Sequence, residues 1–101
     1  MFVIAGHIRI DATNRDAAIT GAKEMMDETL KEKGCLHYVI SADVGDEGLF
    51  HLFEEWESQE ALDAHFKSPH MAQFQKSLGS VGVKELKVRR YEVSSVGPLG
   101  G

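Results

Sequence analysis

The sequence predicts an α+β fold of the ferredoxin-like kind, a split β-α-β antiparallel sheet with its helices on one side. Three observations predict it. Residues 2–10 alternate between two faces, as a strand does, and residues 15–33 place their apolar side chains in one helical stripe. The succession of strand, helix and strand then returns in the second half of the chain. Because 101 residues provide one hydrophobic core, we expect one domain over 1–94 and a flexible Gly/Pro tail over 95–101.

The first half begins with the strand over 2–10, followed by a turn with capping residues over 11–14. The helix expected over 15–33 ends at Gly34, since a glycine commonly follows the last helical turn. A second strand is expected over 35–44, and its alternate residues share one face: Leu36, Tyr38, Ile40, Ala42 and Val44.

A hairpin turn over 45–48 leads into a third strand over 49–57, which is apolar on both faces. The first strand is also apolar on both faces, but the helices can cover only one face of the sheet. An open apolar sheet face would exceed what soluble monomers usually expose. We therefore expect two copies to pack sheet against sheet in a two-fold homodimer.

The remaining elements lie after the third strand. A short helix is expected over 58–67, and Ser68 and Pro69 start another helix, because proline at the first helical position costs no hydrogen bond. We expect Gly79 to end this helix and a fourth strand to occupy 84–94.

Composition restricts the partners and the compartment. The formal net charge of −5 disfavours nucleic acid or an anionic membrane as the main partner. Cys35 is the single cysteine, so no internal disulfide can form and a reducing compartment fits best. The apolar start of the chain is interrupted by His7 and Arg9 and is too short for a signal peptide or a transmembrane span. We expect a cytoplasmic protein.

Two histidines flank the break between the two helices of the second half. His65 lies on the apolar face of the short helix, either as a core-edge histidine bonded to a backbone carbonyl or as a base that projects into a cavity. His70 lies in the first turn of the next helix, where the helix dipole disfavours a positive charge. It either binds a polar substrate group or is a surface histidine.

Two strand residues are further catalytic candidates. His7 lies in the middle of the first strand, and it lines the pocket if its face meets the helices or an interface if that face meets a partner; we favour the pocket. Glu54 shares a face with Trp56 and other apolar residues. A carboxylate in such surroundings either pairs with a cation, such as Arg89 or Arg90, or has a raised pKa.

Three aromatic residues near these positions are candidate substrate contacts, although each could simply pack: Tyr38, Phe66 and Trp56. Metal binding has little support, because His65 and His70 are five residues apart across a helix break, which matches no strong ligand spacing. No glycine-rich loop of the dinucleotide-binding or phosphate-binding type is present. We therefore expect no metal and no cofactor.

Three stretches carry a family resemblance: Gly-Cys-Leu-His-Tyr over 34–38, Glu-Glu-Trp-Glu-Ser over 54–58 and Ala-His-Phe-Lys-Ser-Pro-His-Met over 64–71. Over about residues 2–93 the chain resembles the antibiotic biosynthesis monooxygenase family, and within it the quinol monooxygenase-like proteins. The resemblance implies a homodimeric α/β barrel in which each protomer holds a pocket between its helices and its sheet.

The resemblance also implies a chemistry. Members of this type oxidise phenolic or quinol-like aromatic molecules with dioxygen and without flavin, metal or haem, since a deprotonated substrate can itself reduce dioxygen. The protein supplies an apolar pocket, a base and hydrogen-bond donors, for which His65, His7, Glu54 and His70 are the polar candidates. The positions that align with the Asn, Trp and His of haem-degrading members hold His7, His65 and Gln75, which argues against haem degradation.

Three functions therefore compete at this point. The first is a cofactor-independent monooxygenase that acts on a quinol or a phenol. The second is an acid-base isomerase of a small polar metabolite, which would use the same histidines and hold an anionic group with Lys87 and Arg89 or Arg90. The third is a non-catalytic ligand-binding dimer.

Overall fold

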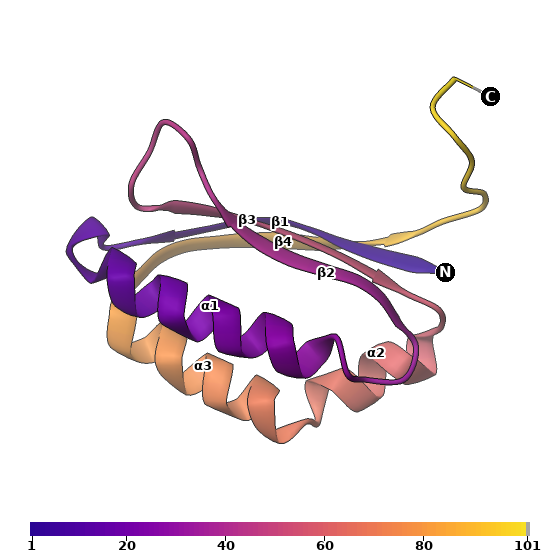
Figure 1. Cartoon of the computed structure of the whole chain (residues 1–101), viewed down its shortest axis with the longest axis horizontal. Helices are drawn as coiled ribbons and strands as arrows, with labels where there is room; N and C mark the ends of the chain where they lie inside the picture. The colour runs from indigo at the N-terminus through magenta and orange to yellow at the C-terminus, as the bar shows by residue number, and fades with distance from the viewer. Residues whose placement is uncertain (101) are drawn as a thin grey trace.

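Four strands form one antiparallel sheet in the order β2-β3-β1-β4, and the helices all lie on one of its faces (Figure 1). The computed structural model describes residues 1–100. Its elements follow the predicted order: β1 (Phe2–Ile10), a 3-10 turn η1 (Ala12–Asn14), α1 (Arg15–Thr29), β2 (Cys35–Ala42), β3 (Leu49–Trp56), α2 (Gln59–Phe66), α3 (Pro69–Val81) and β4 (Val83–Glu92). The α+β, ferredoxin-like prediction is confirmed, with a sheet that is open in the single chain and not closed into a barrel.

The helices cover the face of the sheet that carries the even-numbered residues of β1. Ile4, Ile8 and Ile10 are buried on this face, and Phe50 and Leu52 of β3 lie beside them. Together with residues of the helices they form the hydrophobic core: Ile4, Ile8, Ile10, Ala22, Met25, Tyr38, Ile40, Phe50, Leu52, Trp56, Leu62 and Val81.

The opposite face of the sheet is uncovered in the single chain. Phe53 and Tyr91 point to this side and are 41% and 46% exposed, and both flank the odd-numbered residues of β1, Val3 and Ala5. We call this surface the outer face.

Side-chain caps fix the break between α2 and α3. Ser58 accepts a hydrogen bond from the backbone N–H of Ala61, and Ser68 accepts one from Met71, with Pro69 at the start of α3. The two predicted helix starts are thereby confirmed.

The predicted end of α3 is wrong. The helix continues through Gly79 to Val81 and ends at Gly82, which has a φ of 75°. Gly79 lies exposed within the helix, where glycine is tolerated at a modest cost. Gly82 is the residue that adopts the left-handed conformation for which glycine is suited.

The helix α1 is shorter than predicted and ends at Thr29. A loop over 30–34 closes the connection, and Gly34 has a φ of 87°. A Cβ atom on Gly34 would lie 2.5 Å from the Cβ of Ala61 in α2, and the Gly34 carbonyl accepts a hydrogen bond from the Glu57 backbone at 2.9 Å. This loop is therefore packed directly against the start of α2.

The strand β2 is also shorter than predicted and is irregular at its start. Its register shifts between Cys35 and His37, so Leu36 leaves the buried row and is 51% exposed. The strand ends at Ala42, and of the five residues predicted to share a face, Tyr38 and Ile40 are buried. No helix within residues 1–100 has the length and apolar character that a membrane crossing requires.

Candidate functional site

A cavity of about 270 Å³ lies between the sheet and the helices α2 and α3. All four strands and both helices contribute to its wall, which is mainly apolar. Its lining residues are Ile8, Tyr38, Leu52, Glu54, His65, Phe66, Met71, Phe74, Gln75, Leu78, Leu86 and Val88. An apolar cavity with a few convergent polar groups is the usual form of a small-molecule site.

Glu54 is a buried carboxylate at this cavity. It lies on β3 opposite Tyr38 of β2 and is 5% exposed. Its Oε1 accepts a hydrogen bond of 2.8 Å from Nε1 of Trp56, which is two residues along the same strand face. Burial raises the pKa of Glu54 to about 7; the Trp56 hydrogen bond opposes the rise, and the negative charge of Glu32 adds to it.

His65 is an almost completely buried imidazole at the same cavity, with 1% of its surface exposed. Its ring packs against Trp56 at 4.7 Å between centroids. Nδ1 donates a hydrogen bond of 2.6 Å to Oε2 of Glu32. Burial lowers the pKa of His65, and Glu32 acts in the opposite direction.

The hydrogen bond to Glu32 determines which nitrogen of His65 is free. Because a carboxylate only accepts, the neutral ring keeps its proton on Nδ1 and presents Nε2 as an acceptor. Within residues 1–100, Nε2 of His65 has no hydrogen-bond partner. The ring is thus oriented by Glu32 and has a free basic nitrogen.

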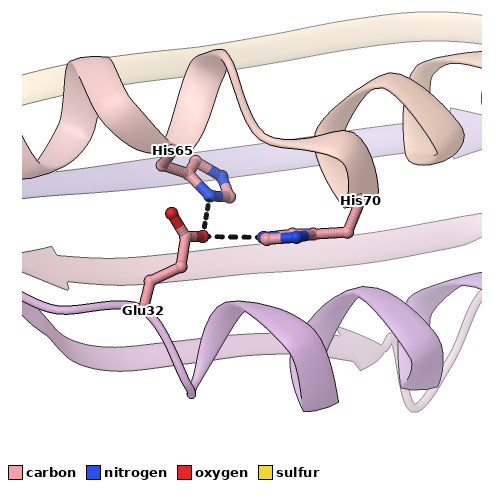
Figure 2. Close-up of side chains that lie close together, drawn as sticks. All are labelled: Glu32, His65 and His70. Carbon is pink, nitrogen blue, oxygen red and sulfur yellow. Dashed lines mark hydrogen bonds and ion pairs between the residues drawn. The ribbon is translucent and has the colours of Figure 1, made fainter.

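His70 completes a cluster around the Glu32 carboxylate (Figure 2). Its Nε2 donates a hydrogen bond of 2.7 Å to the same Oε2 atom that His65 contacts. The three side chains come from the loop after α1, the end of α2 and the start of α3. We call them the Glu32 cluster.

Sequence reasoning missed Glu32. A helix extended to residue 33 places Glu32 away from the apolar stripe, on a solvated side. The helix instead ends at Thr29, and the loop turns Glu32 toward α2. No spacing rule relates residue 32 to residues 65 and 70, because the contact depends on the path of the loop.

The structure places His7 away from the cavity. It lies on the outer face, opposite His51 and Lys87 in the sheet register, and its Nε2 donates to Glu85 at 2.6 Å. The expectation that His7 lines the pocket is therefore wrong, because the odd-numbered residues of β1 face away from the helices. Glu54 and His65 are brought together, and His7 is not.

The other predicted residues fall at different depths. Tyr38 and Phe66 line the cavity, and their role as substrate contacts stays a prediction. Trp56 lies behind the wall, fully buried against His65 and Glu54. His70 does not line the cavity; it contacts Glu32, lies 5.8 Å from the His65 ring between centroids, and lines a separate groove between α1 and α3.

Comparison with known proteins identifies the family. The antibiotic biosynthesis monooxygenase model matches residues 1–77. The chain belongs to this family. Its fold agrees with a crystal structure from Deinococcus radiodurans, named a putative antibiotic biosynthesis monooxygenase, at a TM-score of 0.91 and 26% identity over 100% of both chains.

Two further proteins are similar to this chain in sequence and cover it less completely. An uncharacterised protein of Synechocystis, sll1783, is 25% identical over 96% of this chain, which spans 66% of that protein's length. The Bacillus subtilis protein YcnE, named a putative monooxygenase, is 24% identical over 73% of this chain and 78% of its own length.

Proposed function

We propose that this antibiotic biosynthesis monooxygenase family member oxidises a small phenolic or quinol-type aromatic molecule with dioxygen. The observation that carries the proposal is the apolar cavity in which a buried carboxylate, Glu54, and a buried imidazole, His65, both face the same space. Its volume of about 270 Å³ leaves room for a small ring system, near the lower end of about 300 Å³ for ligand pockets.

The reaction balances without another reductant. A phenol with an unsubstituted para carbon reacts with one dioxygen to give a para-quinone and one water. The substrate loses four electrons, one oxygen atom forms the new carbonyl, and the other leaves as water. The protein then has to remove the phenolic proton, hold the ring and deliver protons to the leaving oxygen.

The cavity residues fit these tasks. Nε2 of His65, left free by the Glu32 hydrogen bond, accepts the phenolic proton. Glu54 exchanges protons near neutral pH, since burial raises its pKa to about 7, and carries a proton to the leaving oxygen. The apolar wall excludes water from the oxidised intermediate.

The isomerase alternative requires a lysine or arginine at the cavity to hold an anionic group, and the three candidate residues lie elsewhere. Lys87 and Arg89 pair in register with His7 and Ala5, on the outer face. The guanidinium of Arg90 lies 5.0 Å from the Phe2 ring. None of these three residues lines the cavity, so an anionic metabolite would have no lysine or arginine partner there.

The same proposal includes a homodimer formed through the outer face. Phe53 and Tyr91 stand exposed on this face, and a second copy would cover them. Sedimentation of the wild-type protein is expected to give a dimer, and Phe53→Glu is expected to give monomers. A monomeric wild-type protein would refute this part.

Oxygen uptake tests the reaction. Purified protein without added cofactor is expected to consume dioxygen with a panel of one-ring and two-ring phenols, and to incorporate one labelled oxygen atom into the quinone. His65→Gln is expected to lower the rate by about 10²- to 10⁴-fold, the usual contribution of a general base. His51→Ala, which changes a histidine paired with Asp43 on the outer face, serves as the matched control once sedimentation shows that this variant has the same oligomeric state as the wild type.

Two results would contradict the proposal. One is the absence of oxygen uptake above the uncatalysed rate across the panel, which together with saturable phenol binding would indicate a ligand-binding protein. The other is an equal loss of rate in His65→Gln and His51→Ala, which would remove His65 from the reaction.

A further inference from the structure

We propose that the Glu32 cluster is a binding site for a divalent transition-metal ion of the Zn²⁺ type. Its three donor atoms are Nδ1 of His65, Nε2 of His70 and a carboxylate oxygen of Glu32, and they lie within 4.8 Å of one another (Figure 2). Two imidazoles and one carboxylate are a donor set that such ions prefer over Mg²⁺ or Ca²⁺. The fourth position is left for water.

The spacing of the donors is close to what a metal requires. Bonds of about 2.0–2.1 Å from a tetrahedral ion place its ligand atoms about 3.4 Å apart. Both nitrogens now lie 2.6 and 2.7 Å from the Glu32 oxygen, so the carboxylate has to withdraw by less than 1 Å. Glu32 lies on a loop and its side chain is partly exposed, so side-chain rotation can provide this movement.

The electrostatics of the cluster also favour a cation. Glu32 has only the two histidines as ion-pair partners, and Glu54 has none, among residues 1–100. The negative charge of Glu32 contributes to the raised pKa of Glu54, so the two carboxylates act on each other across the site. A bound cation would offset the negative charge of Glu32, which no lysine or arginine within residues 1–100 pairs with.

A separate groove borders the cluster at His70. The groove between α1 and α3 has a volume of about 150 Å³, and Glu24, Glu28 and His70 are among its lining residues. Its acidic side chains follow α1 toward the loop that carries Glu32. A hydrated cation can therefore reach His70 without crossing the cavity.

Metal binding would affect the proposed oxidation of a phenol. This consequence, unlike the metal site itself, rests on the proposed function. An ion on Nδ1 takes the position of the proton, and the neutral His65 ring must then carry its proton on Nε2. Nε2 becomes a donor and can no longer accept the phenolic proton. The ion would thus inhibit oxygen uptake in the wild-type protein.

Calorimetric titration with Zn²⁺ tests the site directly. The chelator-treated wild-type protein is expected to bind one Zn²⁺ per chain, and Co²⁺ is expected to give the visible absorption of a four-coordinate ion. Glu32→Gln and His70→Ala are expected to bind Zn²⁺ at least tenfold more weakly. Both side chains are partly exposed, and circular dichroism of the variants before metal addition confirms their fold.

His51→Ala is the matched control, because it removes a histidine from another histidine–carboxylate pair, with Asp43 at 2.8 Å. Unchanged affinity in this variant is expected. The metal site is overturned if Glu32→Gln and His70→Ala bind like the wild type, or if the wild type shows no saturable binding. Neither result depends on a substrate, so failure of the metal site and failure of the oxidation are separate outcomes.

Discussion

The burial of Glu54 predicts that the protein loses stability as the pH rises through the neutral range. The folded-state pKa of Glu54 is about 7, above the ordinary value of 4.5, because the ionised carboxylate is poorly solvated inside the cavity wall. Below pH 4.5, the ordinary pKa, the Glu54 carboxyl is protonated in both the folded and the unfolded chain. Between pH 4.5 and about pH 7 this carboxyl ionises in the unfolded chain but stays protonated in the folded protein, so the free energy of unfolding falls as the pH rises. Above about pH 7 the carboxyl is ionised in both states and the loss of stability is complete.

The size of this effect follows from the same two values. A pKa raised from 4.5 to about 7 corresponds to roughly 3 kcal/mol of folding stability lost between about pH 4.5 and pH 7. Glu54→Gln keeps the shape of the side chain and an oxygen that can accept the Trp56 hydrogen bond, but it never ionises. The variant is expected to match the wild type near pH 4.5 and to exceed it by up to about 3 kcal/mol near pH 8.

Urea unfolding of both proteins, followed by circular dichroism across this pH range, measures the difference. Subtraction of the two curves removes the titration of all other groups. Glu55→Gln is the control, because it removes a charge from the next position of β3, on the outer face. A difference between Glu54→Gln and wild type that does not change with pH would refute the reasoning, and so would an equal rise in Glu55→Gln.

Two further predictions concern the elements around the site. Gly34→Ala is expected to destabilise the protein by more than about 1–2 kcal/mol, the cost of a left-handed conformation for a residue with a Cβ, because that Cβ would also lie 2.5 Å from Ala61. Gly79→Ala, with no atom within 4 Å of its Cβ position, is expected to stabilise the protein by about 0.5–1 kcal/mol. Urea unfolding of the two variants is expected to show changes in stability of opposite sign. Trp56→Phe is expected to cost about 1–3 kcal/mol for the lost hydrogen-bond donor to the buried Glu54 carboxylate, in addition to a packing loss that does not depend on pH. A cost that becomes smaller at low pH, where the carboxyl is protonated, would support this cause, and a cost that is the same at all pH values would contradict it.

The fold was predictable because several local signals agree. The alternation in β1 and the serine caps of α2 and α3 each specify an element without reference to the rest of the chain. Helix ends were less predictable. Gly79 and Gly82 are both glycines near the end of α3, and only the tertiary structure decides which of them adopts the left-handed conformation.

The candidate site was only partly predictable, for two physical reasons. β1 is apolar on both faces, so its pattern does not tell which face meets the helices, and His7 was placed on the wrong side. Glu32 contacts residues more than 30 positions away, through a loop whose path depends on Gly34 packing against α2. Glu54 and His65 were predictable as candidates that share one cavity, because a polar residue within an apolar face is visible in the sequence itself.

The interruption between α2 and α3 has a consequence for recognising related sites in other chains. In an uninterrupted helix, positions 65 and 70 would diverge by about 140° around the axis, yet here both rings reach one oxygen atom. A chain that kept all three side chains but gained or lost a single amino acid in this connection would separate the two imidazoles. The length of the linker is therefore as diagnostic as the identity of the side chains, and a search for such centres has to fix both.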